Sequence, residues 1–243
     1  LSGVGNTAGL AGTGAWATMI SPQYFLSAAH RRPAAGSTLT FFEANDPAKS
    51  HSYTVADWSK PLYWDGMVSD LWMGKLTAPI SAADNIAWYP IAELPWEESY
   101  RELPIYVYGQ PHRVGRNTID LTRTKDISTS TRTRVLTYDY DATGGVGADE
   151  AYMMPGDSGA PSSAIIDGRQ TLVGIHYFNT GTPPADGYYS ADSFVPGYWP
   201  QIQLATALTP PVVFVPEPGV GGLVVVVALL ALKRSRGGLG GRG

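Results

Sequence analysis

The 243-residue sequence contains no cysteine. The chain therefore forms no disulfide, offers no thiolate nucleophile and holds no cysteine-ligated zinc. Charged residues are also scarce, at 16% of the sequence with a net charge of -4. No cluster of Lys and Arg accompanies aromatic residues in the globular part, so nucleic acid is not expected as a partner. No pair of His or carboxylate residues has the spacing of metal ligands on a helix, so we expect no catalytic metal and no cofactor.

Glycine, proline and aromatic residues are plentiful, with 28 Gly, 19 Pro and 11% aromatic residues. Short runs of Val, Thr and Tyr between turn-forming residues are typical of β-strands, and few segments have the period of an amphipathic helix. The sequence therefore predicts an all-β domain. Strands are expected over residues 14–20, 24–27, 39–43, 52–58, 70–76, 103–108, 120–124 and 134–139, and a hairpin over residues 164–166 and 171–175. The Asp167-Gly168 pair between its two strands is typical of a tight hairpin turn.

The composition changes after Leu208. Residues 1–208 form the predicted globular domain, and its first 12 residues, rich in Gly, Ala and Ser, are expected to be weakly structured. Residues 209–219 are a Pro-punctuated connector, residues 220–232 carry no charged or polar side chain, and residues 233–243 are a basic, Gly-rich tail. As a helix the apolar segment is about 20 Å long at ~1.5 Å per residue, against ~30 Å for a hydrocarbon core. We therefore expect a transient membrane stop rather than a permanent span.

Ser158, in the Gly-Asp-Ser-Gly sequence at residues 156–159, is the leading candidate for a nucleophile. A hydroxyl is a poor nucleophile at neutral pH and needs a neighbouring base. The glycines let the backbone turn tightly, so the N–H groups of Gly156 and Ser158 can converge on a developing oxyanion. The same four residues are also a common surface turn, so they do not identify an enzyme by themselves.

His30 is the candidate base, because it follows a strand-like segment and two alanines that permit close packing beneath a cleft. A lone histidine is more often structural. A triad also needs a carboxylate that orients the imidazole and stabilises its charged form. Asp70 opens a strand with apolar alternation behind it, whereas its rivals Asp57 and Asp65 lie nearby and Asp65 is part of a Trp-Asp-Gly turn. We therefore assign the orienting role to Asp70.

In chain order, these segments resemble the trypsin/chymotrypsin family of serine proteases, especially its cysteine-poor bacterial branch. The resemblance rests on Gly-Thr-Gly at 12–14, Ser-Ala-Ala-His at 27–30, Asp-Leu at 70–71 and Gly-Asp-Ser-Gly-Ala-Pro at 156–161. The order His, Asp, Ser differs from that of subtilisins and α/β-hydrolases. The likeness covers about residues 12 to 205.

The resemblance implies two six-stranded antiparallel β-barrels with a catalytic triad between them. It assigns His30 as general base and acid, Asp70 as its orienting partner and Ser158 as nucleophile, with Gly156 and Ser158 forming the oxyanion hole. Protein or peptide substrates would then be cleaved through an acyl-enzyme. The family's first barrel starts further ahead of its histidine, so we expect the N-terminal strand to be partly missing.

In trypsin-like members of the family, a new N-terminus pairs with the Asp that precedes the nucleophile. That residue is Asp157 in this sequence. Leu1 is not the usual Ile or Val for the role, so the sequence does not support activation by cleavage at this position.

The resemblance also assigns a specificity pocket (S1), lined by Tyr152, Met153, His176, Tyr177, Phe178 and Gly187. Tyr152 stands where a trypsin-like preference would need Asp, so cleavage after Lys or Arg is not supported. His176 stands where glutamate-specific members contact an acidic side chain, but we favour a histidine that hydrogen-bonds within the pocket wall. Gly187 would admit a side chain on the opposite wall, so an aromatic preference stays open.

The C-terminal region resembles the PEP-CTERM sorting signal of Gram-negative bacteria. It combines Pro-Glu-Pro at residues 216–218, the apolar segment and a basic cluster at 233–236. The resemblance implies export to the periplasm, cell envelope or extracellular space, membrane contact through this segment and an exosortase-type processing enzyme as partner. An ordinary tail anchor or apolar low complexity is the alternative.

Two further functions remain open. A catalytically silent protease fold would act as a surface or matrix binding protein, although all three triad residues are present. An esterase is disfavoured, because the nucleophile is not in the Gly-x-Ser-x-Gly elbow of that class and it follows the histidine in the chain.

Overall fold

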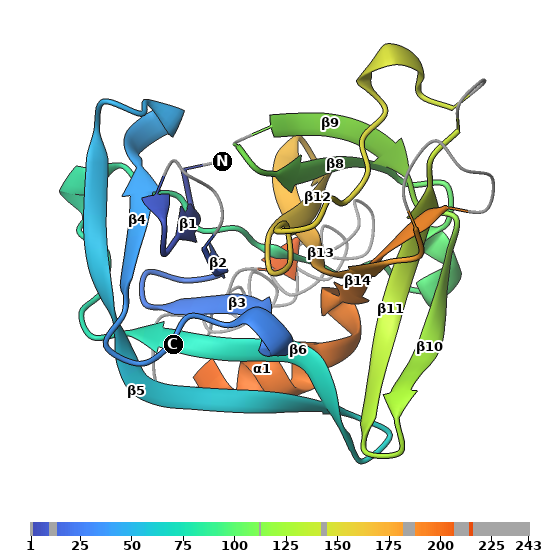
Figure 1. Ribbon diagram of the computed structural model, residues 1–243, viewed down its shortest axis with the longest axis horizontal. Helices are drawn as coiled ribbons and strands as arrows, with labels where there is room; N and C mark the ends of the chain where they lie inside the picture. Colours follow the sequence, from blue (N-terminus) through green and yellow to red (C-terminus); the bar gives the residue numbers. More distant parts are fainter. Residues whose placement is uncertain are drawn as a thin grey trace, which may run out of the picture.

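The computed structural model describes residues 2–9, 14–111, 113–141, 145–181 and 188–206, together with the backbone of 214–215. These residues are mostly strand, with one short α-helix, and the predicted all-β class is confirmed (Figure 1). The strands are β1 (Val4–Asn6), β2 (Trp16–Met19), β3 (Tyr24–Ala28), β4 (Thr38–Phe42), β5 (Ser50–Trp64), β6 (Met67–Leu76), β7 (Ile91–Ala92), β8 (Pro104–Gly109), β9 (Arg113–Thr118), β10 (Leu121–Ser128), β11 (Thr131–Asp139), β12 (Pro161–Ile166), β13 (Arg169–Asn179), β14 (Tyr189–Phe194) and β15 (Phe214–Val215); the helix is α1 (Trp199–Thr206).

Strands β1 to β6 pair edge to edge in a ring. The hydrogen-bonded order is β3-β2-β1-β4-β5-β6, and β6 pairs in turn with β3. Apolar side chains on the inner face form one buried cluster that includes Met19, Phe25, Leu39, Phe41 and Trp72. Strand β3 precedes His30, and strand β6 carries Asp70. Since each has a hydrogen-bonded partner on both sides, both strands are held in register.

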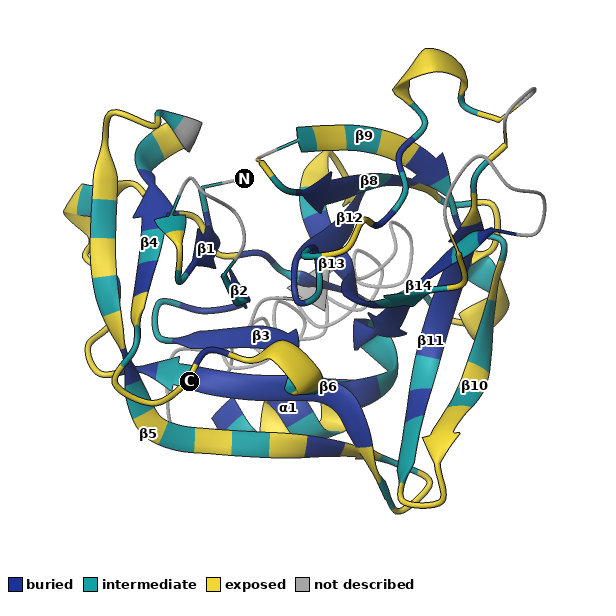
Figure 2. Cartoon of the chain, viewed as in Figure 1, coloured by how far each residue is buried: buried dark blue, intermediate teal, exposed yellow. Residues whose placement is uncertain are grey.

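The second set of strands follows the order β11-β14-β13-β12-β8-β9, and β10 pairs with the other side of β11. Its own buried cluster includes Ile105, Val107, Leu136, Tyr138 and Val173. Buried residues line the facing sides of the strands, while β5 and β10 are largely exposed or half-buried at the outside of the molecule (Figure 2).

A third apolar cluster joins the two sets. Trp16 and Leu26 of the first set pack with Tyr108 and Ile175 of the second. The backbone is continuous as well, because β6 and β11 meet in a parallel pairing. In the described residues the strands therefore form one connected network, and its second set is not closed between β9 and β10. The connected network agrees with the predicted all-β class but does not by itself show two six-stranded barrels.

The predicted hairpin near the C-terminal side of the domain is confirmed. Asp167 and Gly168 both have positive φ, 51° and 71°, as a two-residue hairpin turn between β12 and β13 requires. Asp65 and Gly66 form a similar turn between β5 and β6, with φ of 49° and 78°. In both places the local residue types decide the structure.

Five of the described strands were not expected from the sequence: β1, β7, β9, β14 and β15. Residues 4–6 form β1 within a segment predicted to be weakly structured, because β2 and β4 supply hydrogen-bond partners on both sides. Likewise β9 and β14 owe their conformation to pairing with β8 and with β11 and β13. Pairing across the fold outweighs weak local propensity at each of them.

The short helix α1 packs Ile202 into the cluster that joins the two sets. Within the part of the chain that the structure describes, no helix is long and apolar enough to cross a membrane. The predicted apolar segment 220–232 and the tail 233–243 lie outside the described residues. Of the connector 209–219, only the backbone of β15 is described, and it pairs with β7.

Candidate active site

His30 lies in a single 3₁₀ turn, Ala29–Arg31, that directly follows β3. All residues of β3 are buried, and Ala28 at its end pairs with Leu71 of β6. The register therefore places the His30 turn beside Asp70. The imidazole is 43% exposed, whereas the carboxylate of Asp70 is only 6% exposed.

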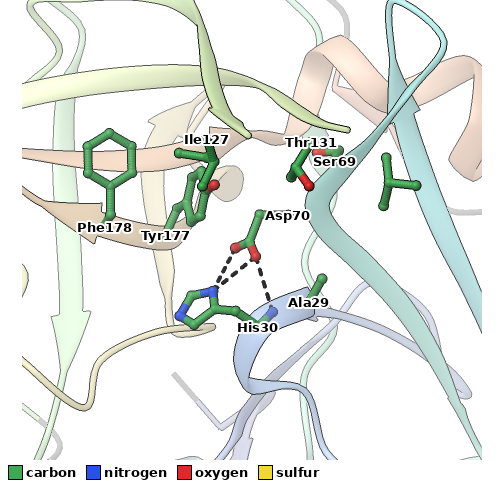
Figure 3. A pocket seen from close by; sticks show the side chains of 9 residues that line it. Ala29, His30, Ser69, Asp70, Ile127, Thr131, Tyr177 and Phe178 are labelled. Carbon is green, nitrogen blue, oxygen red and sulfur yellow. Dashed lines mark hydrogen bonds and ion pairs between the residues drawn. The ribbon is translucent and has the colours of Figure 1, made fainter. Parts of the chain in front are cut away.

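The side chains of His30 and Asp70 are hydrogen-bonded (Figure 3). His30 Nδ1 lies 2.9 Å from Asp70 Oδ1 and 3.0 Å from Oδ2, and the His30 backbone N–H donates to Oδ1 at 3.1 Å. Burial raises the pKa of Asp70, and the hydrogen bonds and charge of His30 only partly offset this effect. Since an ionised carboxylate only accepts, the proton of a neutral imidazole lies on Nδ1 and leaves Nε2 as the basic nitrogen.

Ser158 is half-buried on the loop that precedes β12. Within the described residues its hydroxyl makes no hydrogen bond, including to His30. Gly159, with φ of 91°, instead brings the loop against β3: a Cβ at this position would lie 3.0 Å from Ser27 Oγ and 3.3 Å from the Ala28 nitrogen. The loop bearing Ser158 therefore approaches the strand end two residues before His30. Hydrogen bonds between a nucleophile and its base are often long in ligand-free enzymes.

The backbone around Ser158 turns sharply at Gly156, where φ is 101°. The Gly156 carbonyl accepts a hydrogen bond from Trp16 Nε1 at 2.9 Å, which directs this peptide group toward the first set of strands. Among the described residues, no acceptor receives the N–H of Gly156 or of Ser158. Two backbone donors near the candidate nucleophile are thus free to bind a ligand oxygen.

Asp157 is fully buried behind Ser158 and is bonded on every side. Arg113 of β9 donates to its Oδ2, and the N–H groups of Gln110 and Met154 donate to the two carboxylate oxygens at 2.8 Å. Gly109 leaves the space for this contact, since a Cβ there would lie 2.6 Å from Asp157 Oδ2. The cation that pairs with Asp157 is therefore Arg113, which no short sequence pattern indicated.

A pocket of about 570 Å³ opens beside His30 and Asp70. Its other lining residues are mostly apolar and come from the His30 turn, β6, the β10–β11 hairpin and β13: Ala29, Val68, Ser69, Ile127, Thr131, Tyr177 and Phe178. The ring of Tyr177 lies 5.9 Å from that of His30. Such a pocket suits an apolar side chain next to a reacting group.

The residues assigned to S1 from the sequence have different surroundings in the part of the chain that the structure describes. Tyr177 and Phe178 line the pocket beside His30, while Tyr152 packs between the rings of Tyr140 and Tyr188. Gly187 lies outside the described residues.

Two of the residues assigned to S1 are buried in this structure. Met153 is buried, and its carbonyl accepts from the Tyr188 hydroxyl. His176 has no exposed surface, and both of its ring nitrogens are engaged inside the protein. A contact between His176 and a substrate carboxylate is therefore wrong for this structure, and the favoured hydrogen-bonding role agrees with its contacts.

The rival carboxylates take no part in this site. Asp65 lies 3.5 Å from Arg132, and Asp57 is exposed on β5. Of the three candidates, Asp70 is the one that the fold brings to His30.

Known proteins supply no independent identification: no protein-family model and no curated protein sequence matches the chain.

Proposed function

We propose that the protein is a serine endopeptidase in which Ser158 attacks the peptide bond and His30, oriented by Asp70, is its base. The observation that carries the proposal is the hydrogen-bonded pair of His30 and Asp70. The buried carboxylate binds one ring nitrogen, and the other belongs to a half-exposed ring beside a pocket. The approach of Gly159 to β3 supports Ser158 as the third member.

In the proposed reaction, Ser158 Oγ bonds to the carbonyl carbon of the substrate and passes its proton to His30 Nε2. The N–H groups of Gly156 and Ser158 stabilise the oxyanion. The C–N bond then breaks, and His30 returns the proton to the leaving amine. Water hydrolyses the acyl-enzyme by the same sequence of steps, while Asp70 remains ionised and stabilises the imidazolium.

The finer architecture belongs to the same proposal. The ring β1 to β6 and the open set β8 to β14 correspond to the two barrels of a chymotrypsin-like protease, with the site between them. Because Arg113 already neutralises Asp157, the loop of Ser158 needs no new N-terminus to hold it in place. A crystal structure in which the two sets do not enclose separate cores would contradict the two-barrel description.

A fluorophosphonate probe tests the nucleophile directly. We expect the folded protein to be labelled, the Ser158→Ala variant to remain unlabelled, and Ser130→Ala, a control in the exposed β10–β11 turn, to be labelled normally. Hydrolysis of casein that is abolished in His30→Ala would separate a peptidase from a silent binding protein. An unlabelled wild-type protein, or equal labelling of wild type and Ser158→Ala, would contradict the proposal.

Export and C-terminal sorting are proposed from the sequence alone, since residues 216–243 lie outside the described part. Expression with a C-terminal epitope in a Gram-negative host that processes such signals should yield envelope or secreted protein without the epitope. Cytoplasmic protein that keeps the epitope would contradict sorting without affecting the proposed chemistry.

A further inference from the structure

A second histidine–aspartate pair lies inside the set of strands β8 to β14. His176 of β13 and Asp192 of β14 are direct partners across the two strands, and neither side chain has any exposed surface. His176 Nδ1 lies 2.7 Å from Asp192 Oδ1, and its Nε2 lies 2.7 Å from the carbonyl oxygen of Tyr108 on β8. Both ring nitrogens therefore face oxygen atoms.

The hydrogen-bond partners decide the charge of this ring. The Tyr108 carbonyl can only accept, so Nε2 of His176 carries a proton; if Asp192 is ionised it can also only accept, and Nδ1 is then protonated as well. The Asp192 carboxylate also accepts hydrogen bonds from the hydroxyls of Ser162 and Tyr138. Both donors would stabilise a negative charge on it. Gly174 makes room for this arrangement, because a Cβ there would lie 2.6 Å from Asp192 Oδ2. These contacts suit a buried pair of imidazolium and carboxylate.

The surroundings of the ring favour the charged form. The titratable groups that face it are Asp192 on β14, Tyr138 on β11 and, further away, Asp157 on the nucleophile loop. Burial alone lowers the pKa of His176, but the charge and hydrogen bond of Asp192, the charge of Asp157 and the Tyr108 carbonyl together raise it above the ordinary value.

The backbone of the same residue holds the candidate nucleophile loop. The His176 carbonyl accepts from the N–H of Gly159 at 2.9 Å, and the His176 N–H donates to the carbonyl of Ala160 at 2.8 Å. These two residues directly follow Ser158. The next residue of β13, Tyr177, faces the ring of His30. A displacement of His176 would therefore shift both the loop of Ser158 and one wall beside the base.

We propose that His176 is a positioning residue: its buried ion pair with Asp192 fixes β13 and thereby holds Ser158 and the backbone donors beside it in their reactive arrangement. This inference rests on the proposed peptidase function and assigns His176 a part in catalysis rather than in substrate selection. A misplacement of reacting groups by about 1 Å can reduce a rate on the order of 100-fold. Loss of the ion pair should accordingly reduce reactivity without removing substrate binding.

The Asp192→Asn variant tests the proposal, because Asn has the same shape and keeps hydrogen-bonding capacity but removes the charge. We expect fluorophosphonate labelling and kcat to fall roughly 10- to 100-fold with KM nearly unchanged. Tyr100→Phe is the control: Tyr100 packs in the apolar cluster of the same set, and its buried hydroxyl is bonded to the Ala92 carbonyl. It should label at the wild-type rate. All proteins are compared at a temperature at which circular dichroism shows them folded.

A second measurement reports the protonation state in the wild-type protein. With ¹⁵N-labelled histidine, the signals absent from His176→Gln identify His176, and we expect both of its nitrogens to be protonated at pH 8. If Asp192→Asn does not fold, Ser162→Ala is the alternative: it removes one hydrogen-bond donor to the Asp192 carboxylate and should slow labelling to a smaller extent.

The outcomes are distinguishable from a failure of the proposed function. Wild-type protein that is not labelled contradicts the peptidase, whatever the state of His176. Labelled wild-type protein together with an equally fast, folded Asp192→Asn, or with a His176 ring that carries a single proton, overturns the positioning role and leaves the peptidase intact.

Discussion

The two histidine–aspartate pairs have the same side chains but opposite surroundings. His30 and Asp70 lie at the edge of a pocket, with the imidazole 43% exposed, whereas His176 and Asp192 have no exposed surface. Asp70 leaves one nitrogen of His30 without a protein partner in the described residues; His176 is bonded through both nitrogens. A ring with one free nitrogen can exchange a proton with a substrate, but a ring bonded at both ends can only hold its neighbours in place.

The largest effect is expected at the pair of His30 and Asp70 beside the pocket. Asp70→Asn should reduce kcat/KM by about 10⁴-fold, because the amide no longer stabilises the imidazolium or selects its productive tautomer. The matched control is Asp65→Asn, which alters a carboxylate in the β5–β6 turn that lies near Arg132. Peptide hydrolysis by the two purified variants checks this. Equal activities would remove Asp70 from the proposed triad.

A second comparison concerns Asp157, which is as deeply buried as Asp192 but is paired with an arginine. Arg113→Met should leave the Asp157 carboxylate without a countercharge and lower the free energy of unfolding by about 3 kcal/mol. Fluorophosphonate labelling should slow as well, since Asp157 adjoins Ser158.

Arg116→Met is the control on the same strand, where an exposed pair with Asp149 contributes at most about 1 kcal/mol. Urea unfolding measures both variants. If Arg113→Met were as stable and as reactive as Arg116→Met, the side chain would not be what holds the loop.

The buried pair should also give a pH dependence of stability. The pKa of His176 is raised above its ordinary value of 6.5 in the folded protein. Its protonated form therefore contributes stability that is complete below about pH 6.5 and is lost as the pH rises through the folded value. His176→Gln should be less stable than wild type by about 2 kcal/mol at pH 6, with the difference shrinking toward pH 9. Denaturant unfolding across this range would contradict the charged pair if the difference grew with pH.

The smallest effect is expected at the pocket beside His30. Ile127→Ser should reduce kcat/KM roughly 3- to 10-fold for peptides that present an apolar side chain to this pocket, with little effect on polar ones. Ile165→Ser is the control, because Ile165 on β12 is 51% exposed and Ile127 is 50% exposed. A peptide-library profile compares the two. Unchanged preference in Ile127→Ser would show that the pocket does not select substrate.

Much of the candidate site was accessible from short sequence patterns. The turns at Asp65-Gly66 and Asp167-Gly168 follow from residues that tolerate positive φ, and both were predicted. His30 was predicted to follow a strand and Asp70 to open one, and the strands concerned, β3 and β6, are neighbours in the fold. Ser158 was found through its glycines, and its contact with His30 remains a prediction.

The partners of the buried acids were not accessible in this way. Arg113 precedes Asp157 by 44 residues and Asp192 follows His176 by 16, and no local pattern connects either pair. The same limit explains why β1 was missed: its three residues become a strand because β2 and β4 offer free hydrogen-bonding groups.

The sequence by itself determined the all-β class, the tight turns and the candidate residues His30, Asp70 and Ser158, because these depend on local backbone preferences and residue chemistry. Only the tertiary structure decided which histidine faces a pocket and which is sealed inside. Exposure and countercharge arise from strands distant in the chain that pack together: β6 brings Asp70 to His30, and β8 and β14 enclose His176 between a carbonyl and a carboxylate.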